Sequence, residues 1–285
     1  MKRKTLQELT IKDNFMFAAV MLDSDNCKGV LERALDMKID RVEVQYEKSI
    51  IYHPEYKGIR LDVYAKDENN RHFNVEMQVA SQEIVKRARY YHCQIDTELL
   101  LAGHDYESFP DSYVIFICDF DPFGLSKYRY TLKQTFAEDS DYPYSDGNRT
   151  VFLSTMGTNK TEVSKELVDF LHYVKSEDTQ SGDAYVEKLS ASVNRIKIDR
   201  EMGARFVLLE EMMKDERRAG RAEGLVEGRI NGYIDIIFRL LSAKGFESSE
   251  LKEKISTITD ISVLESLTDA ILTAASPEDL YTHLN

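Results

Sequence analysis

Two short segments in the first third of the chain carry the side chains best suited to chemistry. In residues 59–65 Asp62 alternates with apolar neighbours, and in residues 73–79 Glu76 and Gln78 do the same. Successive side chains of a β-strand point to opposite faces, so this alternation puts each acid on the polar face of a strand. Because the two segments follow each other closely, we expect the two acids on neighbouring strands.

Two carboxylates held within a few ångströms repel each other unless a cation lies between them. Carboxylate oxygens are ligands that Mg²⁺ and Mn²⁺ prefer, and a metal held there activates water and stabilises charge on a phosphodiester. By alternation alone, however, the simpler interpretation is a hairpin whose polar face points into solvent. Asp62 and Glu76 therefore form a candidate metal site that needs further support.

The connection between the two strands decides whether the acids share a side. In an antiparallel hairpin, Asp62 and Glu76 face the same way only if an odd number of residues connects the strands. The connecting residues 66–71 contain Asn69 and Asn70, and asparagine tolerates the positive φ of a tight turn. We expect a bulged connection at this asparagine pair.

Hydrophobic periodicity predicts the elements around this pair. Apolar stripes predict helices, which fall at residues 11–35 with a break at 23–26, 82–101, 162–174 and 184–213. Alternating or continuous apolar runs predict strands, at residues 41–45, 48–52, 59–65, 72–79, 113–118, 127–136 and 150–154. This order of elements predicts an α/β core followed by a helical C-terminal region.

Length and composition describe a globular protein. The 285 residues are 42% hydrophobic, enough for a buried core. No uncharged apolar run reaches the roughly eighteen residues of a membrane span, and the basic start, residues 1–4, does not lead into a signal-peptide core. We therefore expect a cytoplasmic protein without a membrane segment. Three cysteines lack the paired spacing of zinc sites and are expected to be buried thiols; they are Cys27, Cys93 and Cys118.

The formal net charge of −13 counts against non-specific binding to nucleic acid. Phosphate contacts need clustered Lys and Arg, which displace counterions. Net charge is an average, however, and a folded surface can keep a local basic strip while acids lie elsewhere. The charge lowers the support for DNA as a partner without excluding it.

Glycines recur every four residues from Gly220 to Gly232, with Arg and Glu between them. This spacing puts them on one helical face. One interpretation is a close helix–helix contact that makes a homodimer, although the intervening charges rule out a membrane span. The simpler interpretation is a weak linker helix, because each glycine costs roughly 1 kcal/mol relative to alanine. Residues 234–284 are expected to form a small helical tail.

Five short motifs occur in order along the chain. They are Lys12–Phe17, Leu61–Val63, Asn74–Gln78, Arg89–Tyr91 and Leu101–Tyr106. Together they resemble the recombination-promoting nuclease family, also described as PD-(D/E)xK nuclease family transposases. The resemblance spans residues 10–125, and the Arg-, Glu- and Gly-rich residues 216–229 resemble the usual tail of that family.

The resemblance implies a restriction-endonuclease-like fold, a mixed sheet flanked by helices, and metal-dependent cleavage of DNA. It assigns Asp62 and Glu76 as metal ligands and catalytic residues, and Gln78 to the position of the motif lysine. Glutamine hydrogen-bonds a water or a phosphate but supplies no positive charge. Lys86 or Arg89, on the following helix, is a candidate source of that charge.

Further candidate residues surround this centre. Asp13 resembles the acidic residue on the first helix of the family. Arg89 and Tyr90 are candidate DNA contacts, because a cation beside an aromatic ring suits phosphate contact and base stacking. Tyr91 instead lies on the apolar stripe of its helix and is expected to pack in the core.

The sequence therefore predicts two parts, a nuclease-like domain over residues 1–215 and a glycine-spaced linker helix with a small helical tail over 216–285. The expected function is a Mg²⁺- or Mn²⁺-dependent DNA endonuclease that hydrolyses phosphodiester bonds, of the recombination-promoting or transposase type. The alternative is a weak or inactive nuclease-fold protein that binds DNA or a protein partner.

Overall fold

The computed structural model describes residues 4–46, 48–50, 59–81, 83–100 and 105–284. The chain divides into two compact units, residues 1–206 and 207–285. The expected boundary lay after residue 215. Parts of two predicted elements, residues 51–52 of a strand and residues 82 and 101 of a helix, lie outside the described residues.

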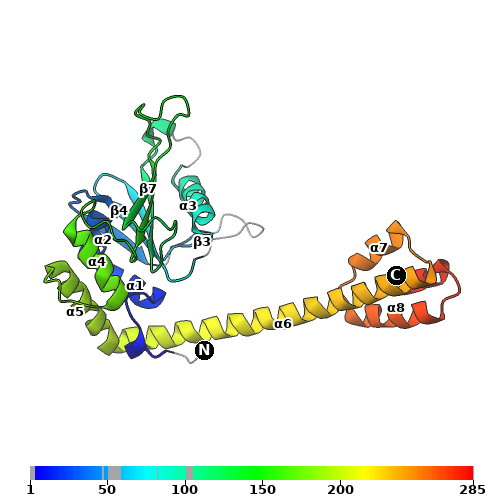
Figure 1. The fold of residues 1–285 in the computed structure, drawn as a ribbon. Helices are drawn as coiled ribbons and strands as arrows, with labels where there is room; N and C mark the ends of the chain where they lie inside the picture. The colour runs from blue at the N-terminus through cyan, green and yellow to red at the C-terminus, as the bar shows by residue number, and fades with distance from the viewer. Residues whose placement is uncertain (1–3, 47, 51–58, 82, 101–104, 285) are drawn as a thin grey trace. The chain divides into compact units, whose positions relative to one another are not determined.

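A mixed six-stranded sheet forms the centre of the first unit (Figure 1). Its strands are, in spatial order, β1 (Val42–Tyr46), β4 (Val63–Asp67), β5 (His72–Gln78), β6 (Ser112–Cys118), β8 (Asn148–Ser154) and β7 (Arg129–Leu132). β5, β6 and β8 run parallel, and the other pairs are antiparallel. Two short strands pair separately, β2 (Ser49–Ile50) and β3 (Ile59–Arg60). The predicted strand over residues 59–65 is thus two strands, β3 and β4.

Helices flank both faces of this sheet (Figure 1). One face carries α1 (Asn14–Met21), α2 (Ser24–Leu35), α4 (Lys165–Ser176) and α5 (Ala184–Ile198), and the other carries α3 (Ile84–Leu99). Short 3-10 turns lie at η1 (Leu6–Glu8) and η2 (Tyr106–Ser108). The predicted break near residue 23 is confirmed, because the Asp23 side chain accepts hydrogen bonds from the first backbone N–H groups of α2. The predicted fold class, a mixed sheet flanked by helices, is confirmed as well.

The hairpin between β4 and β5 has the register that the acid pair requires. Val63 lies opposite Val75, and the pairing continues to Lys66 opposite His72, so Asp62 comes opposite Glu76. Residues 67–71 make the connection, which is an odd number as predicted. Asn70 adopts a positive φ of 60° there, which asparagine tolerates better than most residues.

The two faces of β5 differ in chemistry. The side chains that point away from α3 are apolar and buried, namely Phe73, Val75 and Met77. The side chains that point toward α3 are polar. Three of them, His72, Asn74 and Glu76, are buried, and the fourth, Gln78, is partly exposed. A polar line therefore runs beneath α3 through an otherwise apolar layer formed by Val114, Phe116 and Phe152.

Two polar contacts fix α3 on the sheet. His92 of α3 is buried, and its two ring nitrogens lie 2.9 Å from the Ser112 hydroxyl of β6 and 3.0 Å from the Thr150 hydroxyl of β8. Burial lowers the pKa of His92 to about 4, so the ring is neutral at pH 7 and suits this hydroxyl environment. Tyr91 is 8% exposed and packs in the layer below, as predicted.

The cysteine prediction is correct for two of the three residues. Cys27 and Cys118 are buried, whereas Cys93 is exposed. The reason is helical phase, since Cys93 lies on the side of α3 that faces solvent. Its exposure could not follow from spacing alone.

The second unit is helical. Its elements are the long helix α6 (Arg200–Lys244), which begins in the first unit, α7 (Ser249–Ser256), α8 (Ile261–Thr273) and the 3-10 helix η3 (Pro277–His283). The predicted helix over residues 184–213 is thus two helices, α5 and α6. The end of α6 packs on the others through a core that includes Ile237, Leu241 and Leu267. The elements over residues 234–284, where the tail was expected, are helical.

The regularly spaced glycines of α6 contact no other segment of the described chain, although Arg229 between them lies 3.6 Å from Glu265 of α8. Every residue from 211 to 229 is exposed. A Cβ atom added at Gly220, Gly224, Gly228 or Gly232 would meet no described atom within 4 Å. Across the described ranges, none of the helices has both the length and the apolar character that crossing a bilayer requires.

Candidate metal centre

Asp62 and Glu76 hold each other through backbone hydrogen bonds. The N–H of Asp62 donates to Oε1 of Glu76 at 3.2 Å. In return, the N–H of Met77 donates to Oδ2 of Asp62 at 3.3 Å. Each carboxylate is therefore oriented by the strand that carries the other, and the prediction that the two acids share one side is confirmed.

The electrostatics of Glu76 are those of a buried acid beside a second acid. Glu76 is 2% exposed. Burial, and after it the charge of Asp62, raise the pKa of its carboxyl to about 8 against the opposing effects of the Asp62 N–H, Asn74 and Arg87. The site is thus unfavourable for two negative charges unless a cation neutralises them.

The donor set fits a hard divalent cation. Both candidate ligands are carboxylates on adjoining backbone segments, which suits Mg²⁺ or Mn²⁺. The described residues contain no group of three or more His, Cys, Asp or Glu that could hold a metal. A two-acid site remains sufficient for Mg²⁺, because this ion commonly keeps several waters and uses one or two carboxylates together with substrate phosphates.

Arg87 of α3 joins this centre, although the sequence did not single it out. Its Nη1 donates to Oε1 of Gln78 at 2.8 Å, and its Nη2 donates to the hydroxyl of Tyr91 at 2.8 Å. The same Nη2 lies 3.5 Å from Oε2 of Glu76. A permanent positive charge therefore stands beside the position where the archetypal motif has lysine.

A helical wheel contains the signal that identifies Arg87. Arg87 precedes Ala88 and lies four residues before Tyr91, both of which face the sheet. Residues four apart share one side of a helix. Among the basic residues in the first turns of α3, Arg87 is therefore at the edge of the buried stripe, whereas Lys86 and Arg89 are exposed.

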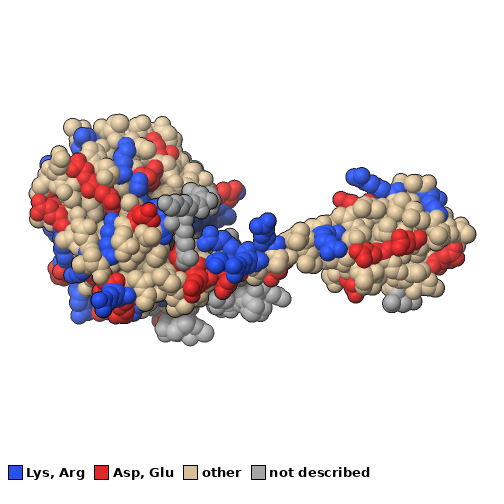
Figure 2. All heavy atoms as spheres, turned by 90° about the horizontal axis from the view of Figure 1, so that it is seen from below, with Lys and Arg blue, Asp and Glu red and all other residues tan. Residues whose placement is uncertain are grey.

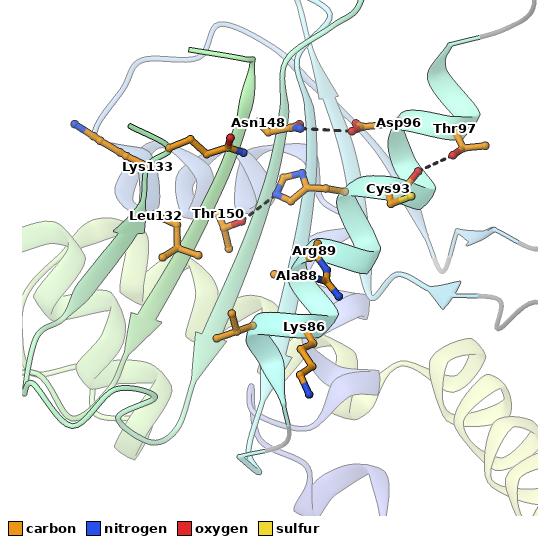
Figure 3. Close-up of a pocket in the computed structure, with 13 residues that line it drawn as sticks. Lys86, Ala88, Arg89, Cys93, Asp96, Thr97, Leu132, Lys133, Asn148 and Thr150 are labelled. Carbon is orange, nitrogen blue, oxygen red and sulfur yellow. Dashed lines mark hydrogen bonds between the residues drawn. The ribbon is translucent and has the colours of Figure 1, made fainter. Parts of the chain in front are cut away.

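Lys86 and Arg89, the residues expected to supply the missing charge, line a different feature. Both border a cavity of about 670 Å³ between α3 and the strands β7 and β8, with Leu132 and Thr150 on the opposite wall (Figure 3). Lys86 also lies 3.6 Å from Glu83 in an exposed ion pair. The contacts of the described residues thus bring Arg87, rather than Lys86 or Arg89, to Gln78.

The remaining candidates, Asp13 and Tyr90, contact residues other than Asp62 and Glu76 in the interactions described below. The Asp13 carboxylate accepts hydrogen bonds from the backbone N–H of Thr10 and from Nζ of Lys4, each at 2.8 Å. Asp13 precedes α1 and closes the turn that leads into it. Tyr90 is partly buried and packs against the apolar layer beneath α3.

Acidic and basic side chains are interspersed over the first unit on the face drawn in Figure 2. The net charge of −13 is therefore not gathered into one acidic surface on that face. An anionic ligand can still approach a local group of cations in such an arrangement.

A protein-family comparison agrees with this fold. A family model described as PD-(D/E)XK nuclease family transposase matches residues 23–219, which include the whole six-stranded sheet, Asp62, Glu76 and α3. Comparisons with curated proteins and with solved structures give no match. The family match covers more than half of the chain and confirms the resemblance seen in the sequence motifs. The chain therefore belongs to the PD-(D/E)XK nuclease family transposases.

Proposed function

We propose that this protein is a metal-dependent DNA endonuclease in which Asp62 and Glu76 are ligands of Mg²⁺ or Mn²⁺. The observation that carries the proposal is the acid pair itself, two carboxylates oriented by each other's strand, with the pKa of Glu76 raised to about 8 by burial and by Asp62. A bound divalent cation would remove this repulsion. It would also lower the pKa of a bound water and stabilise charge on a phosphodiester.

Gln78 and Arg87 have complementary roles in this proposal. The hydrogen bond between them fixes the amide of Gln78 and the guanidinium of Arg87 in one arrangement. Guanidinium donors match phosphate oxygens in geometry and keep their charge at all working pH values. We assign to Arg87 the stabilisation of charge on the phosphodiester, and to Gln78 the orientation of a water or phosphate. Neither side chain exchanges a proton at neutral pH.

The first turns of α3 carry exposed cations that suit contact with the DNA backbone. Lys86 and Arg89 are exposed on the same helix that carries Arg87. Within the described residues, Arg89 has no ion-pair partner, so its guanidinium is available to a phosphate. We assign Arg89 to backbone contact, with Lys86 and Tyr90 beside it.

Plasmid cleavage tests the proposal. Supercoiled plasmid is incubated with the wild type, Asp62→Ala and Glu76→Ala, each with Mg²⁺, with Mn²⁺ and with EDTA. The expected result is nicking by the wild type only with metal and a loss of at least a hundredfold in both variants, a typical effect of removing charge stabilisation. Equal activity in all three proteins would contradict the assignment of Asp62 and Glu76 as metal ligands.

A second candidate function is a catalytically silent module that binds DNA or a protein partner. It is favoured by Gln78 at the lysine position and by the net charge of −13. Titration calorimetry with Mn²⁺ separates the two candidates. Absence of Mn²⁺ binding, together with retained binding of DNA or a partner, would establish this second function.

A homodimer through Gly220–Gly232 would let two centres cut the two strands of a duplex. The exposed glycine face of α6 is compatible with such a contact. Analytical ultracentrifugation at micromolar concentration tests it. A monomer there would reject the dimer and leave the linker-helix interpretation.

A further inference from the structure

Asn74 is a buried amide without a hydrogen-bond partner. It lies at the middle of β5, opposite Tyr64 of β4 and Val114 of β6, and its side chain is 0% exposed. Neither Oδ1 nor Nδ2 finds a partner within the described chain. A buried polar group that loses water and gains no hydrogen bond destabilises the folded state.

Packing alone gives no reason for an amide at this position. The layer around Asn74 beneath α3 is formed by apolar and aromatic side chains, including Val114 and Phe116. A leucine has nearly the shape of asparagine and would bury an apolar surface there instead. The unsatisfied amide therefore needs a partner that the arrangement of side chains in this structure does not provide.

That partner is close by on the same strand. Asn74 and Glu76 are two residues apart and point to the same face of the sheet. Oε1 of Glu76 accepts from the Asp62 N–H, and Oε2 faces Arg87 at 3.5 Å, which leaves lone pairs on both oxygens unused. The amide of Asn74 does not reach hydrogen-bonding geometry with either oxygen in this arrangement.

We infer that Asn74 is a positioning residue of the metal centre, whose Nδ2 donates a hydrogen bond to the ionised Glu76 carboxylate when a divalent cation is bound. The inference rests on the proposed function, because it concerns the same centre. A carboxylate that ligates a metal must keep one orientation, and an amide donor aimed at its oxygens holds that orientation. Groups that orient metal ligands in this way contribute roughly 10- to 100-fold to metal affinity.

The inference predicts opposite effects of one substitution on two measurements. Asn74→Leu removes the unsatisfied amide, so the melting temperature of the protein in EDTA should stay unchanged or rise. The same variant leaves Glu76 without its donor, so the Kd for Mn²⁺, measured by titration calorimetry, should increase at least tenfold. A residue that serves only packing would not separate these two quantities.

Asn26 provides a matched control. It is another fully buried asparagine of the first unit, but its Nδ2 donates to the Val20 carbonyl at 3.0 Å and to the Ser192 hydroxyl at 3.1 Å. Asn26→Leu breaks both hydrogen bonds and should lower the melting temperature in EDTA. Because Asn26 lies in α2, it should leave the Kd for Mn²⁺ unchanged.

The outcomes distinguish this inference from the proposed function. If the wild type binds no Mn²⁺, the metal centre is refuted and the inference with it. If the wild type and Asn74→Leu bind Mn²⁺ equally, the role of Asn74 is refuted and the metal centre stands. Calorimetry is run at a temperature where circular dichroism shows each variant folded. Weaker Mn²⁺ binding by a folded Asn74→Leu whose melting temperature in EDTA is unchanged or higher supports the inference, whereas a lower melting temperature in EDTA overturns it.

Discussion

Arg87 and Gln78 form a hydrogen bond of 2.8 Å between the guanidinium Nη1 and the amide Oε1. The pair joins the first turn of α3 to the end of β5 and places a cation beside the acid Glu76. Glutamine at the position of the motif lysine is thus accompanied by a charge from another backbone position. This relationship makes Arg87 the most informative residue for substitution.

Arg87→Gln should slow DNA cleavage while leaving metal binding in place. The variant removes the guanidinium assigned to stabilise charge on the phosphodiester, and loss of one such donor commonly reduces kcat by about 10²- to 10³-fold. Single-turnover nicking rates and Mn²⁺ calorimetry measure the two properties. A cleavage rate within threefold of wild type would contradict the role assigned to Arg87.

Gln78→Lys should partly rescue Arg87→Gln. In the double variant the ammonium returns a positive charge to the motif position without a neighbouring guanidinium to repel it. The nicking rate should recover at least tenfold relative to Arg87→Gln alone. The control is Gln78→Met with Arg87→Gln, which restores no charge and should show no recovery; recovery there would argue against an electrostatic cause.

Glu76→Gln should change the pH dependence of stability in EDTA. The folded pKa of Glu76, about 8, lies above its usual value of 4.5, so the folded state binds more protons than the unfolded state between these values. Stability of the wild type is therefore lost as pH rises from about 5 to about 8. Glu76→Gln lacks this loss. The melting temperature of the variant relative to that of the wild type should therefore increase as the pH rises over the same range.

Glu162→Gln is the control for that comparison. Glu162 is exposed, and its hydrogen bonds to Lys127 lower the pKa of its carboxyl. It is ionised throughout this range in both the folded and the unfolded state. The difference in melting temperature between Glu162→Gln and the wild type should stay constant between pH 5 and about 8. A difference that grows with pH would mean that a group other than Glu76 causes the pH dependence.

Arg89→Gln should weaken DNA binding in a salt-dependent manner. If Arg89 contacts one phosphate, its removal lowers the slope of log Kd against log salt by about 1. Fluorescence anisotropy with labelled DNA in Ca²⁺ measures binding without relying on cleavage. Arg195→Gln, an exposed change on α5 across the sheet from α3, should leave the slope unchanged; equal slopes for all three proteins would remove Arg89 from the interface.

Replacing Gly220, Gly224 and Gly228 by alanine tests the two interpretations of α6. No described atom lies within 4 Å of the added Cβ positions, and each alanine stabilises a helix by about 1 kcal/mol relative to glycine. For a linker helix, helicity by circular dichroism should rise and sedimentation should not change. Conversion of a dimer to a monomer would instead show that the glycines form a seam between two copies.

Local patterns in the sequence determined the central hairpin and the order of elements. Alternation of period two placed Asp62 and Glu76 on strand faces, and the need for an odd connection predicted the register that joins them, with Asn70 at a positive φ. These features depend on neighbours along the chain. The ordered motifs identified the family, and they did so without information on contacts.

Tertiary structure decided which side chains complete the centre, although the apolar stripe of α3 already has Arg87 at its edge. Three cations, Lys86, Arg87 and Arg89, lie within four residues, and the rotation of α3 on the sheet selects Arg87. That rotation depends on packing and on His92, which bonds to strands distant in sequence. The unsatisfied burial of Asn74 is likewise invisible in an alternating pattern, because alternation assigns a face to a side chain and only the packing of α3 excludes water from that face.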